Sequence, residues 1–592
     1  MFSASYDYPK FKMTKPTAIH QQTSQSELTR ALLDCKSAFM AVGVFSLFIN
    51  VLLLMPSIYM LQVYDRVLPA SSEATLLMLT LMVLFLFIVM GGLEWIRSQI
   101  MNVTGNKLDN LLNTRIYNAL FSKTLADGGR SISAQPLNDL QQIRQFMTGP
   151  GLLAFFDAPW LPIYILMLFL FHPFFGVVAI FSALVLVGIA IWNERATKTD
   201  LENAAKESMA AQQMTQANLR NAEVIEAMGM LPQVRERWRQ RQSNHLVLHS
   251  KATAKGGLIS ALSKFYRLSI QSLILGIGAY LAIHREITPG LVVAGSILMG
   301  RALAPIDQII AQWRSVLQAR EAYHRLDTLL QIMPDRADPM PLPALKGEIR
   351  LEKCVIVPPG AQTPIIKGIS FTLEPGDHVA IVGPSAAGKS TLARAILGIY
   401  QPIEGAVRLD GAEIKHWDRV QLGGFIGYLP QDVELLDGTI SENIARFGEI
   451  DPEKVVAAAQ NAGVHEMILR LQDGYDTKIE GRGYALSAGQ RQRLGLARAL
   501  YGEPRVLLLD EPNSNLDQEG DMALQRSLRL LKQTGRTVII ITHRTNILSQ
   551  MDKILLLVQG EIVQYGPADQ VLAALQQPVQ KPVESSIPAT AN

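Results

Sequence analysis

Residues 379–397 read VAIVGPSAAGKSTLARAIL, and this stretch decides the fold of the C-terminal half of the chain. An apolar run, 379–382, leads through a glycine-containing loop into a helical pattern, which is the context of a phosphate-binding P-loop. The glycines let backbone N–H groups surround phosphate oxygens, and the helix N-terminus adds positive potential. Lys389 is expected to reach the β- and γ-phosphates, and the Ser390 hydroxyl to bind Mg²⁺. The predicted nucleotide contacts in this loop are Gly383, Pro384, Ser385, Ala386, Ala387, Gly388, Lys389, Ser390 and Thr391.

Two further apolar strands are predicted to end in polar residues. Residues 506–509 run into Asp510 and Glu511, and the strand TVIIIT at 537–542 precedes His543. An acidic pair after a buried strand can serve a metal ion and a water molecule, so Asp510 is expected to hold Mg²⁺ and Glu511 to polarise the attacking water. His543 is placed to contact the γ-phosphate. The alternatives, a surface turn and a structural histidine, are less favoured because a P-loop lies upstream.

The overall composition excludes several classes of protein. The chain has 592 residues, enough for roughly three or four domains. It carries 55 Lys and Arg against 52 Asp and Glu, a net charge of +3, which gives no case for a nucleic-acid binder. Its two cysteines are too few for a metal cluster or a disulfide scaffold. Only 18% of the residues are charged, against about 25% in soluble proteins, and the mean hydropathy is +0.17.

The apolar residues lie mostly in the first half of the chain, in long runs without Asp, Glu, Lys or Arg. A membrane span needs about 20 apolar residues, so the longest run is enough for two closely spaced helices. The last two runs are weaker and could be buried core helices, although a helix that lines a polar pathway would also be less apolar. Six membrane helices are therefore predicted. The runs are residues 38–61, 74–93, 158–192, 268–283 and 287–300.

The charge of the loops predicts the orientation in the membrane. The first run, 38–61, is longer than the 7–15 apolar residues of a signal peptide and should stay as an anchor. Residues 95–157 and 193–257 are long and rich in Lys and Arg, whereas the other connections are short. Basic loops stay in the cytosol, so both termini and both long loops are expected there. Helix-forming residues in the long loops predict that the membrane helices continue below the bilayer.

The chain is thus predicted to contain an α-helical membrane domain followed by an α/β P-loop domain. The C-terminal tail has the composition of a disordered segment. The expected divisions are an N-terminal segment (1–36), a transmembrane domain (37–335), a nucleotide-binding domain (345–570) and the tail (577–592).

The C-terminal half resembles the cassette of ATP-binding cassette (ABC) transporters. The string LSAGQ at 486–490 is similar to the family's signature motif, and YLPQ, which ends at Gln431, is similar to its Q-loop. NSNLD at 513–517 resembles the D-loop, and His543 the switch histidine. With six spans before it, the cassette implies the fold of an ABC exporter. Since this family binds two ATP molecules between two cassettes, each between one P-loop and the opposite signature, the resemblance implies a homodimer.

The resemblance also implies functional residues and cofactors. The cofactors are ATP and Mg²⁺. The implied catalytic residues are Glu511, His543 and Gln431, the implied metal ligands are Ser390, Gln431 and Asp510, and the signature adds Ser487, Gly489 and Gln490 to the nucleotide contacts.

Three strings narrow the resemblance to one branch. MPSIYMLQVYDRVLP at 55–69, FFDAPWLPIY at 155–164 and EPNSNLD at 511–517 resemble type I secretion permease/ATPases, in particular those that export alkaline proteases and related calcium-binding repeat proteins. This implies an ATP-driven, multi-pass exporter of an unfolded protein in the bacterial inner membrane, in contact with lipid and not with nucleic acid. The implied partners are a periplasmic membrane-fusion protein and an outer-membrane channel. The alternative is a lipid or drug flippase of the same architecture.

Three residues depart from the pattern of the family. Ala386 and Ala488 stand where many exporters have glycine, and a methyl group is strained there if the backbone φ is positive. Pro358 stands where aligned exporters place an aromatic ring that stacks on adenine. The base should therefore be bound less tightly.

Two further expectations concern the membrane half. Short helices near 136–142 and 221–230 are expected to transmit force from the cassette. Arg267, Arg301 and Asp157 lie at the edges of predicted spans, where an ionisable group is a functional candidate. At least one of these arginines is expected to face a central cavity, and the alternative is that both extend to the membrane interface.

Overall fold

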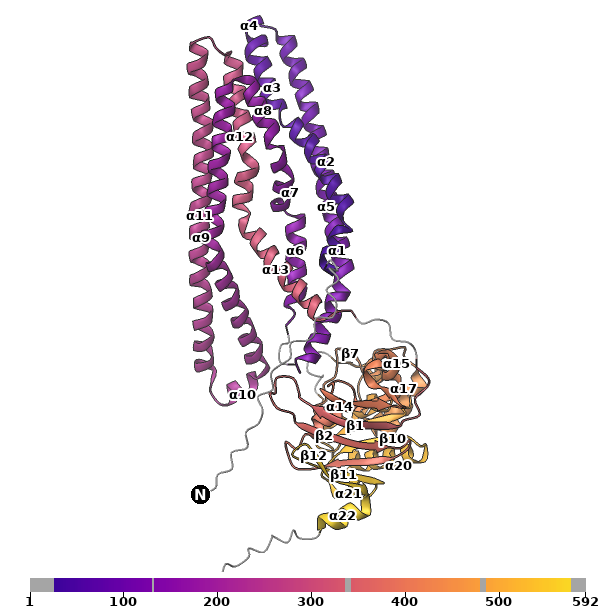
Figure 1. The fold of residues 1–592 in the computed structure, drawn as a ribbon. Coiled ribbons are helices and arrows are strands. Elements are labelled where there is room, and N and C mark those ends of the chain that lie inside the picture. Colours follow the sequence, from indigo (N-terminus) through magenta and orange to yellow (C-terminus); the bar gives the residue numbers. More distant parts are fainter. Residues whose placement is uncertain (1–25, 130–132, 336–341, 480–485, 577–592) are drawn as a thin grey trace, which may run out of the picture. The chain divides into compact units, whose positions relative to one another are not determined.

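The computed structural model describes residues 26–129, 133–335, 342–479 and 486–576 (Figure 1). The predicted tail, 577–592, lies outside these residues. The chain forms two compact units. A helical unit comprises Met1–Ser122 and Ile132–Asp335, and a nucleotide-binding unit comprises Lys123–Ser131 and Arg336–Asn592.

Within the residues that the structure describes, six helices or helix groups of the helical unit are long and apolar enough to cross a membrane, as predicted. Three of its helices have 54, 48 and 53 residues. At 1.5 Å per residue each is about 70–80 Å long, more than twice the roughly 30 Å of a bilayer core. The long polar loops of the sequence are therefore helical extensions of the spans. The helices are α1 (Glu27–Leu33), α2 (Lys36–Leu52), α3 (Met55–Gln62), α4 (Leu68–Ala70), α5 (Glu73–Ala126), α6 (Gln135–Thr148), α7 (Pro150–Asp157), α8 (Leu161–Phe171), α9 (Pro173–Arg220), α10 (Ala222–Ala227), α11 (Leu231–Ile283), α12 (Pro289–Ala311) and α13 (Trp313–Ile332).

The two predicted force-transmitting helices differ in form. Residues 221–230 contain the short helix α10, followed by Gly229 at a φ of 63°. Residues 136–142 are instead part of the longer helix α6, because Ala134 and Pro136 start a helix that continues without interruption to Thr148. The expectation of a separate short helix is therefore wrong for the first segment.

A buried polar network joins four helices of this unit. The guanidinium of Arg97 in α5 lies 2.8 Å from Asp157 at the end of α7 and 2.9 Å from the Ser46 hydroxyl in α2. Asn50 donates to the same carboxylate at 3.0 Å, and Tyr164 in α8 donates to Asn50 at 2.8 Å. Asp157 and Tyr164 belong to the string at 155–164, so that string serves helix packing.

The two arginines predicted at the edges of spans, Arg267 and Arg301, differ in whether they form an ion pair. Arg267 in α11 pairs with Asp307 in α12 at 3.2 Å, and Ser263 donates to that same carboxylate. Arg301 in α12 is exposed and has no ion-pair partner in the part of the chain that the structure describes. The pairing of Arg267 explains how its charge is tolerated, and Arg301 stays a candidate for a polar pathway.

The nucleotide-binding unit contains two main sheets. An antiparallel sheet has the order β2-β1-β4-β5, and a larger sheet has the order β12-β11-β3-β10-β9-β6. The strands are β1 (Ile349–Ile356), β2 (Ile366–Leu373), β3 (His378–Val382), β4 (Glu404–Leu409), β5 (Ala412–Glu413), β6 (Ile426–Leu429), β7 (Gly438–Thr439), β8 (Lys478–Ile479), β9 (Val506–Asp510), β10 (Thr537–Ile541), β11 (Lys553–Val558) and β12 (Glu561–Pro567).

The central strands of the larger sheet are buried on both faces. Alternate residues of β3 point to opposite sides: Ala380 and Val382 join one apolar core, and Val379 and Ile381 join the other. A strand that is covered on both faces is a continuous apolar run in the sequence, and for this reason these strands could be predicted from the sequence.

The helices of this unit are α14 (Lys389–Ile396), α15 (Arg419–Phe425), α16 (Ile440–Ile444), α17 (Pro452–Asn461), α18 (His465–Leu469), α19 (Ala488–Leu500), α20 (Gln518–Gln533), α21 (Thr545–Leu548) and α22 (Ala568–Gln576).

The order of the strands assembles the predicted site. Strands β3, β10, β9 and β6 are parallel neighbours, so their carboxyl ends meet at one edge of the sheet. The P-loop follows β3, His543 follows β10, Asp510 and Glu511 end β9, and Gln431 follows β6. Segments more than 100 residues apart in the sequence are thereby brought together, at the place where open α/β sheets bind ligands.

Candidate nucleotide-binding site

The P-loop connects β3 to α14 in a tight turn. Gly383 has a φ of 156°, and a Cβ atom there would lie 2.1 Å from the carbonyl oxygen of Leu557, so only glycine fits. Gly388 has a φ of 101° and stands immediately before α14. The Lys389 ammonium donates to the carbonyl oxygens of Gly383 and Pro384, at 2.8 and 3.0 Å. The loop thus folds around its own lysine, at the positive end of a helix that favours phosphate.

Asp510 lies beside Ser390, as a shared metal site requires. Its carboxyl is buried, with 4% of the residue exposed, and this burial raises its pKa. A hydrogen bond from Ser390 opposes that shift, whereas the negative charge of Glu511 adds to it. A divalent cation would neutralise this pair of neighbouring carboxylates, of which Asp510 is buried and Glu511 is partly exposed. The described residues contain no group of three His, Cys, Asp or Glu side chains that could hold a metal alone. Mg²⁺ suits such a site, because it binds through one or two protein oxygens together with phosphate oxygens.

Glu511 is contacted by both of the other predicted catalytic residues. The Gln431 amide donates to its carboxylate at 3.0 Å, and the His543 Nδ1 atom lies 4.0 Å from it. Glu511 has a φ of 49°, an uncommon conformation for a residue other than glycine. The His543 side chain is 76% exposed, so it can approach a phosphate without losing a buried contact. The three side chains form one cluster beside the P-loop edge.

One residue of the site was not assigned a role from the sequence. Gln492 in α19 is 1% exposed, and its amide group donates to the backbone carbonyl oxygen of Glu511 at 3.1 Å. Its side-chain oxygen accepts from the backbone N–H of Asn515 at 3.0 Å. It therefore links α19 to the segment that follows β9. Gln492 stands two residues after the signature string at 486–490, and this position is the sequence signal that could have identified it.

The signature residues form the N-terminus of α19. The Ser487 side chain accepts from the backbone N–H of Gln490 at 3.2 Å, and Gln490 accepts from the backbone N–H of Ser487 at 2.8 Å, which makes a capping box. A Cβ atom on Gly489 would lie 2.7 Å from the carbonyl oxygen of Asn515. Within the described residues, no hydrogen bond joins 487–490 to the P-loop of the same chain. One chain therefore does not connect its own signature to its own P-loop.

The three residues that depart from the family pattern, Ala386, Ala488 and Pro358, differ in how the structure accommodates them. Ala488 is the first residue of α19 and has an ordinary negative φ, so its methyl group is accommodated. Ala386 has a φ of 64°, which costs about 1–2 kcal/mol for a residue with a side chain. Pro358 is half-buried. The aromatic residue Tyr400 in the same unit is 8% exposed, and its hydroxyl accepts from Arg394 at 2.9 Å.

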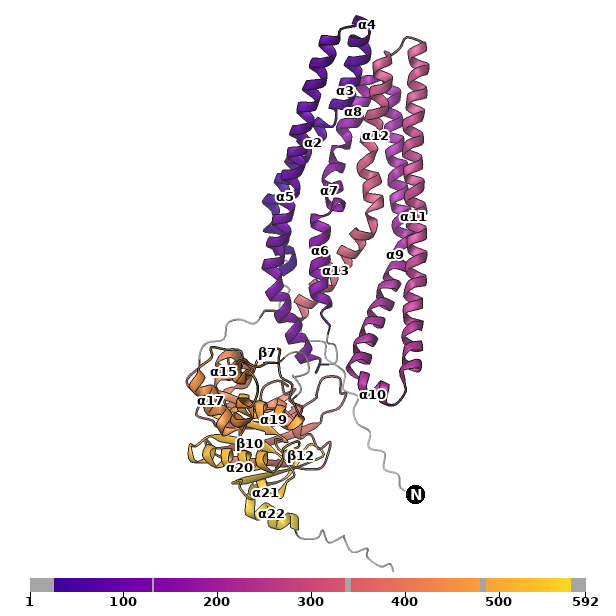
Figure 2. The ribbon, with the colours of Figure 1, turned by 180° about the vertical axis from the view of Figure 1, so that it is seen from behind.

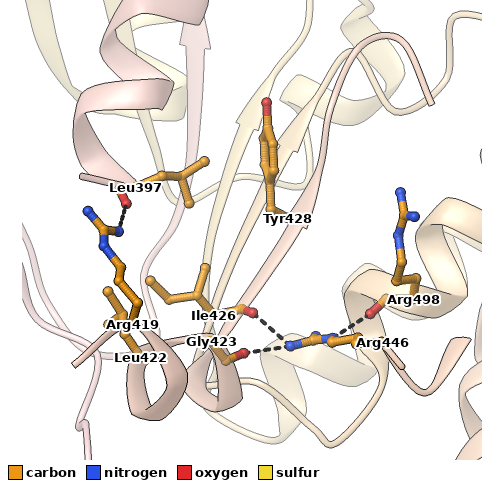
Figure 3. Close-up of a pocket in the computed structure, with 8 residues that line it drawn as sticks. All are labelled: Leu397, Arg419, Leu422, Gly423, Ile426, Tyr428, Arg446 and Arg498. Atoms are coloured by element: carbon orange, nitrogen blue, oxygen red, sulfur yellow. Dashed lines mark hydrogen bonds between the residues drawn. The ribbon is translucent and has the colours of Figure 1, made fainter. Parts of the chain in front are cut away.

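A hollow of about 320 Å³ lies in the same unit, and none of the predicted nucleotide contacts lines it (Figure 3). Arg446 lies at its base and donates to the carbonyl oxygens of Gly423, Ile426 and Arg498, at distances from 2.6 to 3.1 Å. Burial lowers the pKa of the Arg446 guanidinium. Since these carbonyls belong to α15, the start of β6 and α19, this arginine connects the strand before Gln431 to the signature helix.

Comparisons with known proteins match both units of the chain. Residues 366–514 match the ABC transporter family, and residues 39–304 match the ABC transporter transmembrane region. The chain is 43% identical to the type I secretion system ATP-binding protein PrsD of Rhizobium meliloti, over 93% of this chain and 95% of that protein. It is 27% identical to the leukotoxin translocation ATP-binding protein LktB of Mannheimia haemolytica, over 96% of this chain and 82% of that protein.

The solved structures support the same fold. A bacterial Atm1-family ABC exporter with ATP bound is similar with a TM-score of 0.77 and 22% identity, over 93% of this chain and 97% of that chain. This likeness concerns the fold, whereas the similarity to PrsD extends along nearly the whole sequence. The P-loop unit is thus an ATP-binding ABC ATPase that is fused to a membrane domain. The chain belongs to the ABC transporter family, among the type I secretion system ATP-binding proteins.

Proposed function

We propose that this chain is the ATP-driven exporter of a type I secretion system, which moves an unfolded protein out of a Gram-negative cell. The observation that carries this proposal is the 43% identity to a type I secretion protein over 93% of the chain. The expected cargo is an alkaline protease or a related repeat protein with a C-terminal signal. This finer assignment rests on the strings at 55–69 and 155–164.

ATP hydrolysis at the site is assigned to this chain's own residues. Lys389 and the backbone of the P-loop hold the phosphates, and Ser390 with Asp510 would hold Mg²⁺, which neutralises phosphate charge. Glu511 accepts the proton of the attacking water, and its carboxylate is oriented by the Gln431 amide at 3.0 Å. His543, 4.0 Å from Glu511, contacts the γ-phosphate when it moves toward it.

The active form is a homodimer. The supporting observation is that residues 487–490 are not bonded to the P-loop of their own chain, within the residues that the structure describes. A second copy supplies its signature to complete each site. Its positive helix N-terminus at Ser487 then faces the phosphates from the opposite side.

The helical unit lies in the inner membrane with both termini in the cytosol. The basic composition of 95–157 and 193–257 supports this orientation. A periplasmic membrane-fusion protein and an outer-membrane channel complete the pathway, and the chain does not act on nucleic acid. The alternative function, a lipid or drug flippase, uses the same architecture and needs neither partner.

Secretion reconstituted in a host that lacks its own type I systems tests the proposal. The chain is expressed with a membrane-fusion protein, an outer-membrane channel and a secreted protease from its own gene neighbourhood. Protease in the medium that depends on all components, and that disappears with Glu511→Gln, is the expected result. If ATP hydrolysis is normal and no protein reaches the medium, while labelled lipid or drug is moved in proteoliposomes, the flippase alternative holds instead.

A further inference from the structure

Gln492 of α19 is a buried polar side chain to which the proposed reaction assigns no role. It lies near the N-terminal end of this helix, which packs beside α17 and β6 (Figure 2). Only 1% of the residue is exposed. Burying an amide costs free energy unless its donor and acceptor groups are bonded, so the partners of Gln492 show what this side chain holds in place.

Both polar atoms of the Gln492 amide are bonded to the short segment that follows β9. The nitrogen donates to the backbone carbonyl oxygen of Glu511 at 3.1 Å and to the hydroxyl of Ser514 at 3.3 Å. The oxygen accepts from the backbone N–H of Asn515 at 3.0 Å. Since two of the three bonds go to the backbone, this side chain fixes the conformation of the segment itself.

The segment begins with Glu511, whose backbone conformation needs such support. Its φ of 49° lies in the left-handed region, and a residue with a side chain stays there only where its surroundings hold it. Its N–H donates to the carbonyl oxygen of Ile541 at 2.9 Å. Its carbonyl oxygen accepts from Gln492 and, at 3.2 Å, from the backbone N–H of Ser514. These contacts set the direction in which the carboxylate leaves the strand, toward the amide of Gln431.

Residues on either side of Gln492 bring α19 close to the same segment at other points. Arg493 pairs with Asp517, whose side chain caps α20. Gly489 lies so near the segment that a Cβ atom there would be 2.7 Å from the carbonyl oxygen of Asn515. Within the described residues, the hydrogen bond from α19 to Glu511 comes from Gln492 alone. The neighbours therefore hold the middle and the end of the segment, and Gln492 holds its beginning.

We propose that Gln492 is a positioning residue for ATP hydrolysis. It holds the backbone of Glu511 so that the carboxylate stays where it can accept the proton of the attacking water. This inference rests on the proposed function, because it takes Glu511 to be the general base. Gln492 acts through Glu511 and not through the P-loop, so the rate of hydrolysis depends on it and the binding of ATP does not.

Steady-state phosphate release by Gln492→Met, measured on the full chain in nanodiscs, tests the inference. Methionine has nearly the same length and removes all three hydrogen bonds. Because a misplacement of about 1 Å in a catalytic group can cost about 100-fold in rate, we expect kcat to fall by about that factor. The KM for ATP and the affinity for a fluorescent ATP analogue should not change. A kcat within a few-fold of wild type, or a raised KM with unchanged kcat, would overturn the inference.

A second variant, Gln492→Glu, adds a readout that a purely structural role would not move. An ionised carboxylate cannot donate to the carbonyl oxygen of Glu511, whereas a protonated carboxyl group can. The kcat of Gln492→Glu, taken relative to that of the wild type, should therefore rise as the pH falls. A ratio that does not change with pH would contradict the proposed hydrogen bond.

The combination of Gln492→Met with Glu511→Gln separates positioning from a general loss of structure. If Gln492 acts through Glu511, the double variant should hydrolyse ATP in a single turnover as slowly as Glu511→Gln alone. A further loss in the double variant would overturn the inference.

The packing control is Leu496→Ala, at a residue of the same helix that is 2% exposed and has no polar side chain. This control should lower the midpoint of thermal unfolding and keep the kcat of the folded protein. An equal loss of kcat in Leu496→Ala and Gln492→Met would show that only packing is involved. If Glu511→Gln itself turns over like the wild type, or if the wild type exports no protein, the proposed function fails instead.

Discussion

The two units of this protein use their charged side chains in different ways. In the nucleotide-binding unit, Lys389 comes from the P-loop and Asp510 and Glu511 from the end of β9, and these two segments meet at one edge of a sheet. In the helical unit, charges are distributed as separate pairs between helices, such as Arg97 with Asp157 and Arg267 with Asp307. Phosphate chemistry needs several groups at one place, whereas a membrane helix needs only to have each charge neutralised. Substitutions should therefore affect activity in the first unit and folding in the second.

The largest effect is expected from Glu511→Gln and from Lys389→Ala. The first removes the proposed general base and the second removes the proposed phosphate contact, and loss of a general base alone typically lowers the rate about 10²–10⁴-fold. Glu511→Gln should still bind ATP and accumulate as a closed dimer. Steady-state phosphate release measures the rate, and the exposed Glu503→Gln is the control. Turnover within a few-fold of wild type in either site variant contradicts the assignment.

Arg97→Ala should reduce stability and leave the nucleotide chemistry intact. The variant leaves the carboxylate of Asp157 in a largely buried site without its cation, which costs up to about 3–5 kcal/mol. Size-exclusion chromatography monitors the thermal unfolding of the variant in detergent. We expect the midpoint temperature of this unfolding to fall. The exposed Arg195→Ala is the control. If Arg97→Ala unfolds like wild type, the network does not hold α2, α5 and α7 together.

His378 should make the nucleotide-binding unit sensitive to acid. Burial lowers its pKa to about 4, from about 6.5 in the unfolded chain. The unfolded state therefore takes up a proton first as the pH falls, so stability decreases between pH 6.5 and about 4, by roughly 3 kcal/mol in total.

Denaturant unfolding of the full chain at several pH values, followed by a probe in the nucleotide-binding unit, measures this dependence. In His378→Gln the decrease over the same pH range should be smaller, whatever the stability of that variant at neutral pH. If the free energy of unfolding of His378→Gln depends on pH as steeply as that of the wild type, other groups cause the acid sensitivity.

The smallest effect is expected at the base of the nucleotide. Stacking of a base on an aromatic ring is worth about 1–3 kcal/mol, and Pro358 offers no such ring. Pro358→Tyr should lower the KM for ATP about tenfold if about 1.4 kcal/mol is recovered, whereas Pro358→Leu should not. Steady-state kinetics with ATP and with GTP measure the KM for each nucleotide. An unchanged KM, with a strong preference of the wild type for ATP, would mean that the base is held by other residues.

The parts of the protein that the sequence predicted best share a physical cause. The strands before Gly383 and Asp510 are buried on both faces and are therefore continuous apolar runs. The six spans are detectable because lipid excludes charge over about 20 residues. The role of Gln492 was missed because its partners, Glu511 and Asn515, are distant in the sequence and accept or donate through their backbones. The short helix expected at 136–142 was wrong because the helix continues through residues 143–148.

The sequence by itself determined the chemistry of the protein: a P-loop, an acidic strand end, a signature and six apolar spans, each encoded by neighbouring residues. Only the tertiary structure decided which distant residues meet. The strand order β3-β10-β9-β6 placed His543 and Gln431 beside Glu511, and helix packing paired Arg97 with Asp157. Local patterns follow from backbone geometry and solvent exclusion, whereas such contacts depend on how separate elements pack against one another.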